Sequence, residues 1–91
     1  MPVSSILLEM DKTQLGTVLE RAIGMLGGSD SELTLDFTSV DRVGPDDLKL
    51  LEKVGTVAAG KSARVVLRGI NVRIYKALKI ANLTERFGFE K

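Results

Sequence analysis

The sequence predicts a small α/β domain with a mainly parallel β-sheet in the order β-α-β-α-β-α. Three observations lead to this fold class. Short apolar stretches alternate with three longer stripes at helical spacing. Glycine-containing turns separate them. Strands that alternate with helices pair in parallel through right-handed crossovers, so helices are expected mostly on one face of the sheet. With 91 residues, the chain is expected to form one domain, residues 1–91.

The first strand is expected over residues 5–10, with a helix after it. The apolar positions of this helix recur at helical spacing, at Leu15, Val18, Leu19, Ala22, Ile23 and Leu26. Asp11 or Thr13 is a candidate N-cap, because Asp11 and Gln14 have the spacing of a capping box. Gly27 and Gly28 are expected to provide a left-handed C-cap. Residues 29–31 are expected to form a loop.

Residues 33–51 contain the clearest signals in the sequence, for a strand, a helix start and a binding surface. The apolar residues of this stretch first alternate with polar ones, at Leu33, Leu35 and Phe37. This pattern predicts a strand over 32–37 with one sheet face less fully covered. Gly44 and Pro45 then indicate a helix start, since proline suits the first helical position. Asp46 and Asp47 follow where the helix dipole favours carboxylates. We expect the working surface at this junction, because partners often meet the carboxyl ends of parallel strands.

The rest of the chain predicts a helix, a strand and a second helix. The helix over 45–59 should bury Leu48, Leu51, Val54, Val57 and Ala58. A turn at residues 60–62 leads into a strand, Arg64–Arg68, which Gly69 ends. The last helix carries an apolar stripe with Tyr75 on its flank: Ile70, Ile74, Ala77, Leu78 and Ala81. Asn82 suits its C-cap, because asparagine tolerates the left-handed conformation. The tail over 83–89 is expected to end as an edge strand, whose apolar residues leave a homodimer open: Leu83, Phe87 and Phe89.

Composition argues against several classes of protein. The net charge of +1 argues against general nucleic-acid binding. The absence of cysteine excludes a disulfide framework and thiolate metal sites, and it fits a reducing compartment. No apolar run approaches the roughly 18–20 residues that span a bilayer, and the first residues lack the basic segment of a secretory signal. We therefore expect a cytoplasmic protein without nucleic-acid binding or direct membrane insertion.

Two patterns suggest ligand sites, and each has a simpler explanation. Residues 55–62 match the phosphate-binding loop G-x-x-x-x-G-K-[ST]. Such a loop leaves a strand and enters a helix, whereas this match begins in an expected helix, where Lys61 complements the negative end. The four carboxylates near the junction are a candidate Mg²⁺ or phosphoacceptor set: Asp36, Asp41, Asp46 and Asp47. The helix dipole already explains the last two.

The chain is not expected to be an enzyme. It contains no histidine and no cysteine, which removes the commonest general base and the best nucleophile. Its serine and threonine residues have no evident activating partner in the sequence. We therefore expect no catalytic residue, no cofactor and no metal.

Three segments resemble a STAS domain, the fold of bacterial anti-sigma-factor antagonists. Residues 35–43 are similar to the family's apolar strand and the turn after it. Residues 48–51, Gly60 and residues 64–67 are similar to its helix, glycine turn and third strand. Residues 72–83 with Phe87 are similar to its last helix and closing segment. The resemblance covers about two-thirds of the chain, and the order and spacing of the segments carry it.

The resemblance implies a non-catalytic signalling module that regulates transcription. The family has Asp-Ser-Ser-Gly between strand and helix, and a partner kinase phosphorylates the second serine. This chain has Gly44-Pro45-Asp46-Asp47 there, which makes Asp46 the phosphoacceptor equivalent. Asp46 would be a permanent partial mimic, with a charge of about −1 against about −1.5 to −2 for phosphoserine. The chain also departs from the family at Asn82, where glycine is common, and in a shortened N-terminal hairpin.

The implied partner is an anti-sigma factor or a related regulatory kinase. The expected partner-binding residues are Thr38, Asp41, Arg42, Val43, Gly44, Pro45, Asp46, Asp47, Lys49 and Lys53. An alternative is a STAS-like accessory subunit of an ABC-type membrane transport complex, in contact with its ATPase subunit. A remote alternative, a nucleotide binder through residues 55–62, predicts ATP affinity that is lost in Lys61→Ala.

Overall fold

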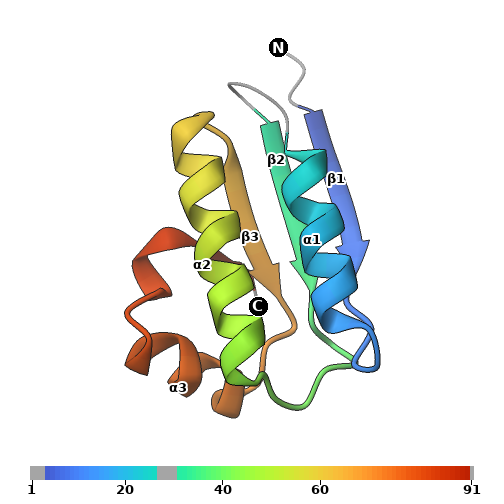
Figure 1. Ribbon diagram of the computed structural model, residues 1–91, viewed down its shortest axis with the longest axis vertical. Helices are drawn as coiled ribbons and strands as arrows, with labels where there is room; N and C mark the ends of the chain where they lie inside the picture. The colour runs from blue at the N-terminus through green and yellow to red at the C-terminus, as the bar shows by residue number, and fades with distance from the viewer. Residues whose placement is uncertain (1–3, 27–30, 91) are drawn as a thin grey trace.

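The fold alternates strands and helices as predicted and adds a short final strand. A computed structural model describes residues 4–26 and 31–90. The elements are β1 (Ser4–Glu9), α1 (Leu15–Met25), β2 (Ser31–Asp36), α2 (Pro45–Gly60), β3 (Arg64–Arg68), α3 (Val72–Ile80), the 3₁₀ turn η1 (Thr84–Arg86) and β4 (Gly88–Glu90) (Figure 1). The predicted edge strand at the end of the chain is therefore confirmed as β4.

The described strands form one parallel sheet in the order β1-β2-β3-β4. Each strand pairs with the next one in the chain, so strand order nowhere reverses. Open α/β sheets usually bind small ligands at such a reversal, in the crevice that it opens. This topology supplies no crevice of that kind. A binding surface at the carboxyl ends of the strands would therefore depend on the side chains found there.

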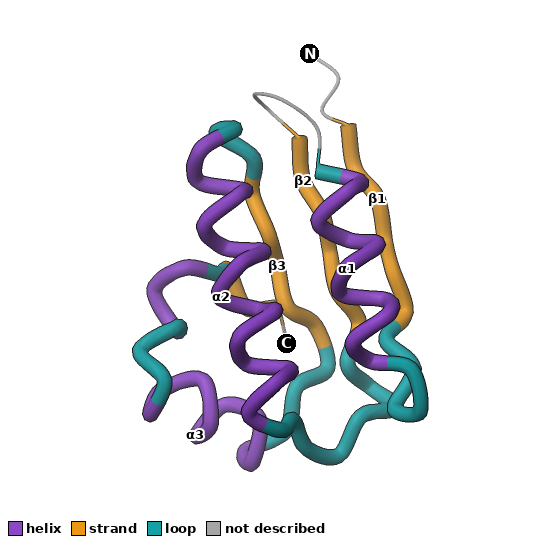
Figure 2. Tube along the Cα trace, in the orientation of Figure 1, coloured by secondary structure: helices purple, strands orange, loops and turns teal. Residues whose placement is uncertain are grey.

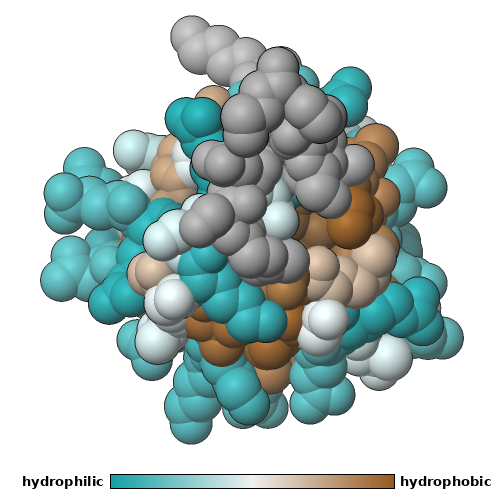
Figure 3. All heavy atoms as spheres, turned by 90° about the horizontal axis from the view of Figure 1, so that it is seen from above, coloured by the Kyte–Doolittle hydropathy of each residue, from teal (hydrophilic) through white to brown (hydrophobic). Residues whose placement is uncertain are grey.

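Helices α1 and α2 lie side by side over one face of the sheet (Figures 1 and 2). The core fills the space between these layers, and its fully buried side chains include Leu19, Leu35, Phe37, Leu51, Leu67, Ile74 and Leu78. Of the positions predicted to face inward on α2, Leu51, Val54 and Ala58 are buried, while Leu48 and Val57 are partly buried against the core. Seen from the end in Figure 3, apolar atoms lie toward the middle and hydrophilic side chains surround them.

The opposite sheet face has no described helix packed on it. Its side chains alternate with the core-facing ones, and none that the structure describes is buried: Leu7, Glu9, Glu32, Thr34, Asp36, Arg64, Val66, Arg68 and Glu90. Leu7 is 52% exposed there. The alternation predicted for the second strand therefore marks a real difference between the two faces. Parallel sheets are usually covered on both faces, which makes the open face unusual.

The predicted cap of α1 at Asp11 or Thr13 is wrong. Gln14 is the N-cap residue, and its side chain makes no capping hydrogen bond. The Asp11 carboxylate instead accepts from Thr13 N and Thr13 Oγ1, at 2.9 and 2.8 Å. These bonds lower the pKa of Asp11, the backbone bond being the larger cause. At the other end α1 stops at Met25, and the expected C-cap at Gly27 and Gly28 lies outside the described residues.

Several boundaries differ slightly from the prediction. Ser31 begins β2 instead of ending a loop, and α2 extends to Gly60. Ile70 and Ala81 flank α3 and pack against the core from outside the helix. Asn82 follows the helix with φ of 65°, as its predicted role in the left-handed cap requires.

The apolar tail packs on the domain instead of standing free. Leu83 and Phe87 are buried, so these two are not available for pairing with a second copy. Phe89 is partly exposed and packs edge-to-face on Tyr75, with 5.5 Å between ring centroids. The homodimer suggested for this tail therefore loses two of its three apolar residues.

Candidate functional site

The junction between β2 and α2 begins with a turn held by Asp36. Its Oδ1 accepts hydrogen bonds from Thr38 N, at 2.9 Å, and from Thr38 Oγ1. Both bonds favour the ionised carboxyl and lower the pKa of Asp36, the side-chain bond more than the backbone bond, while Arg68 nearby adds a smaller effect. Val40 N then donates to the Phe37 carbonyl at 2.9 Å, which closes the turn. The acidic group predicted as a ligand here is therefore a structural element of the turn.

The end of β3 lies against this turn. Phe37 N donates to the Arg68 carbonyl oxygen at 2.8 Å. Gly69 follows with φ of +69°, and a Cβ built on it would collide with Thr38 Oγ1 and stand 3.1 Å from Thr38 N. Only glycine combines this backbone conformation with so close an approach. The structure thus explains why Gly69 ends the strand where the sequence predicts.

Asn71 connects the junction to α3. Its Oδ1 accepts from Ile74 N at 2.9 Å, which makes it the N-cap of α3. Its Nδ2 donates to the Asp41 carbonyl oxygen at 2.8 Å. Our reading of the sequence missed this residue. The available signal was an asparagine immediately before the third helix, where asparagine is a favoured N-cap.

The start of α2 is as the sequence predicts. Pro45 is the first helical residue, and Gly44 N donates to Asp47 Oδ2 at 2.9 Å. Leu48 N donates to the Gly44 carbonyl at 3.0 Å. The Asp47 carboxylate is therefore engaged as a reciprocal cap, whereas Asp46 is exposed. Both carboxylates also lie near the positive end of the helix dipole.

Most of the expected partner-binding residues are exposed, either in the loop after β2 or along α2. Seven are exposed: Thr38, Asp41, Arg42, Pro45, Asp46, Lys49 and Lys53. Gly44 and Asp47 are partly buried. Val43 is partly buried too, and it packs against the hydrophobic core. We call the seven exposed residues the junction surface.

The helical part of the junction surface is a single stripe. Asp46, Lys49 and Lys53 are three and four residues apart on α2, so they project from the same side of the helix. A shallow hollow of about 340 Å³ adjoins the loop part, lined by Lys12, Thr13, Asp41 and Arg42. Lys12 and Thr13 were absent from the expected site. Their place follows from the parallel pairing of β1 with β2, which brings the two following loops together.

The residues of the phosphate-loop match do not form a phosphate-binding loop. Gly55 to Gly60 belong to α2, and the chain then turns toward β3, so no strand precedes the match. Lys61 Nζ donates to the Leu26 carbonyl at 3.2 Å, across to the end of α1. Gly55 allows the Arg86 side chain to pack closely on α2, since a Cβ at this position would lie 3.2 Å from Arg86 Cδ. The reversed context that the sequence predicts for this motif is confirmed.

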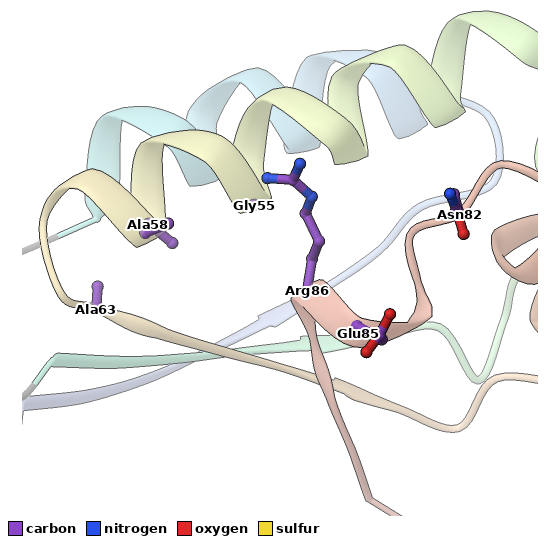
Figure 4. A pocket seen from close by; sticks show the side chains of 7 residues that line it. Gly55, Ala58, Ala63, Asn82, Glu85 and Arg86 are labelled. Carbon is purple, nitrogen blue, oxygen red and sulfur yellow. The ribbon is translucent and has the colours of Figure 1, made fainter.

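An open hollow of about 470 Å³ lies beside this part of α2 (Figure 4). It is lined by Gly55, Ala58, Ala59, Ala63, Asn82, Glu85 and Arg86. Arg86 rises from η1 toward Gly55, as Figure 4 shows. Small alanine side chains form its wall, and its two charges have opposite sign, so the hollow has no feature that selects an anion.

The structure also bears on metal sites and on membrane-spanning helices. Among residues 4–26 and 31–90, no three or more Asp, Glu, His or Cys residues gather closely enough to hold a metal ion. None of the described helices has the length and apolar character needed to cross a bilayer. The chain matches no protein-family model and no curated protein. The residues and geometry of the junction are therefore the basis for a function.

Proposed function

We propose that the protein is a non-catalytic interaction module that docks another protein through the junction surface. The observation that carries this proposal is the contrast between a fixed backbone and free side chains. Asp36, Asn71 and Asp47 hold the loop and the helix start by side-chain hydrogen bonds. The charged residues between these anchors remain exposed: Asp41, Arg42, Asp46, Lys49 and Lys53. A surface that is ordered before binding loses little conformational entropy when a partner docks.

The charge pattern of the junction surface favours a protein partner. Two acids and three cations are mixed along it, in the order Asp41, Arg42, Asp46, Lys49 and Lys53. A nucleic-acid surface would need a concentrated basic face. Interleaved charges instead suit a partner with its own matching pattern, where they fix orientation and partner choice more than raw affinity.

The resemblance to STAS domains supplies the class of partner. In that family the strand-to-helix junction binds a regulatory kinase or anti-sigma factor. Asp46 is at the second position of α2 and exposed, which is the place of the family's phosphorylated serine in this alignment. We therefore propose a cytoplasmic regulatory role in transcription. Asp46 would be a fixed negative charge where the family has a serine that is switched by phosphorylation.

Site-specific photo-crosslinking in living cells tests this proposal. A benzophenone amino acid would replace Asp46 in one variant and Glu20, which is exposed on α1, in a control. Position 46 is expected to capture one defined protein that position 20 does not. Mass spectrometry then separates the classes: an anti-sigma factor or kinase supports the proposal, and a transporter ATPase supports the alternative client. Equal capture from both positions, or none from position 46, contradicts docking at the junction surface.

Nucleotide binding through residues 55–62 has a separate test. Titration with an ATP analogue would be followed through the amide NMR signals of Gly60 and Lys61. The geometry of α2 predicts no saturable shift, because the helix directs its negative end toward this segment. Saturable shifts that disappear in Lys61→Ala would restore the nucleotide hypothesis.

A further inference from the structure

The domain has two uncovered surfaces of opposite charge. The first, which we call the acidic sheet face, is the β1–β2 part of the open face: Leu7, Glu9, Glu32, Thr34 and Asp36. The register places Leu7 beside Thr34 and Glu9 beside Asp36. The strands β1 and β2 contain three acids and no Lys or Arg. Arg64 and Arg68 of β3 lie on the same open face, beside Glu32 and Asp36 in the register, so uncompensated negative charge is left mainly near Leu7 and Glu9 at the β1 edge.

The second surface is the outer side of α3, which we call the basic helix face: Val72, Arg73, Tyr75, Lys76, Lys79 and Ile80. Ile74 and Leu78 hold the inner side of the helix in the core. The outer side exposes Val72 by 68% and Ile80 by 88%, the two most exposed of the large apolar side chains described. The helix contains three cations and no acid. The charged side chains of this helix are therefore all positive.

The net charge of the chain conceals this separation. From Lys53 through Thr84 the sequence has seven Lys or Arg residues, Lys53 included, and no Asp or Glu, although the whole chain carries only +1. The remainder of the chain must therefore be acidic. Two of these cations, Arg64 and Arg68, lie on the open sheet face, whereas the three on α3 are apart from the acids of β1 and β2.

We propose that the basic helix face of one copy packs on the acidic sheet face of a second copy. The cations of α3 would meet Glu9 and the acid-rich β1 edge of the sheet, and Val72 and Ile80 would cover the exposed Leu7. Parallel sheets are normally covered by helices on both faces, so α3 of the neighbour would complete the missing layer. Complementary charge on one and the same chain favours a second copy over other occupants of either face.

The contact must be between different copies and must join unlike surfaces. Strand order puts β1 at one edge of the sheet and β4 at the other, and α3 precedes β4. The helix therefore cannot reach its own β1–β2 face. A contact between unlike surfaces leaves one of each kind free at the ends, so copies assemble into an open chain or a closed ring. Neither face contains a residue of the junction surface, so a docked partner and this assembly are separate events.

Sedimentation equilibrium with paired variants tests the proposal. The wild-type chain is expected to exceed its monomer mass of 9.9 kDa progressively as concentration rises. Raising the salt concentration from about 0.05 to 0.5 M should weaken the association roughly tenfold, because exposed charges are screened. Lys76→Glu with Lys79→Glu removes only the basic face, and Glu9→Lys with Glu32→Lys removes only the acidic face. Each double variant alone is expected to stay monomeric.

The decisive step is to mix the two double variants. Each retains the face that the other has lost, and the two charge-reversed faces are also complementary to each other, so the mixture should regain the association that neither variant shows alone. Arg21→Glu on α1 is the control, which should associate like the wild type. Circular dichroism verifies that every variant is folded. A wild type that is monomeric at about 1 mM, or a mixture that does not pair, contradicts the proposal. Binding of the wild type to anionic vesicles or to DNA without self-association assigns the basic face to another partner and equally overturns it.

Discussion

Asn71 Nδ2 donates a hydrogen bond to the Asp41 carbonyl oxygen at 2.8 Å, and this bond ties the start of α3 to the loop that enters α2. The two residues are 30 positions apart in the chain. The same side chain caps α3 through Ile74 N. One asparagine therefore fixes both a helix and the proposed docking loop, and the two roles can be separated by mutation.

Asn71→Ala should lower the free energy of unfolding by about 1–2 kcal/mol, since it removes the cap and the bond to Asp41. Asn71→Asp should cost less, because a carboxylate still accepts from Ile74 N and suits a helix N-terminus. The aspartate cannot donate to the Asp41 carbonyl, so amide hydrogen exchange in residues 38–43 should accelerate in both variants. Unchanged exchange in Asn71→Asp would show that this bond does not hold the loop.

Gly69→Ala should destabilise the fold by about 2–3 kcal/mol, measured by urea denaturation. The left-handed φ is unfavourable for alanine, and the added methyl group meets Thr38. Gly24→Ala is the matched control, because Gly24 lies within α1 and a Cβ there meets nothing within 4 Å. The control should be stabilised by about 0.5–1 kcal/mol. Equal effects of the two substitutions would contradict the close packing of β3 on the turn.

Thr38→Val should raise the pKa of Asp36 toward its ordinary value, as measured by NMR titration of the carboxyl group. The lost Thr38 hydroxyl is the largest cause of the lowered pKa. A carboxyl whose pKa is lowered by folding stabilises the fold above its unfolded pKa, and this contribution disappears as the pH falls through the folded pKa. The stability difference between wild type and variant should therefore be full at neutral pH and shrink in acid. A difference independent of pH would assign the effect to packing.

Substitutions of Asp46 and Asp47 compare two carboxylates at the start of α2, of which only Asp47 accepts a capping hydrogen bond. Asp47→Ala should reduce stability by about 1 kcal/mol, because Gly44 N loses its acceptor as well as a favourable charge at the helix dipole. Asp46→Ala loses only the interaction with the dipole, about 0.3–0.5 kcal/mol at an exposed site. Thermal unfolding at low salt measures both. A larger loss for Asp46 would mean that it has a structural role that the exposed position does not suggest.

The regular elements could be predicted because local patterns determine them. Alternation at Leu33, Leu35 and Phe37 marked both a strand and its buried face, and Pro45 marked the first residue of α2. The cap of α1 could not be predicted in the same way. Asp11 satisfies a capping pattern, but its side chain bonds within the preceding turn instead, and the sequence does not decide between these local alternatives.

The candidate site could be predicted only where its residues are close together in the sequence. Asp46, Lys49 and Lys53 were found because helix periodicity places them together. Asn71 and Lys12 were missed, because they join the site through strand pairing and a contact between distant loops. The packing of Val43 against the core was also not predicted, since a valine in a polar loop gives no sign of this contact.

Isothermal titration with the protein captured at position 46 tests docking at the junction surface most directly. The wild type, Asp46→Lys and Glu20→Lys would be compared at one salt concentration. Charge reversal at Asp46 is expected to weaken binding at least about tenfold, in the range of a charged interface contact. The same reversal at Glu20 should leave binding unchanged, and both variants should unfold like the wild type within about 0.5 kcal/mol. Equal affinity of the wild type and Asp46→Lys would contradict docking at this surface.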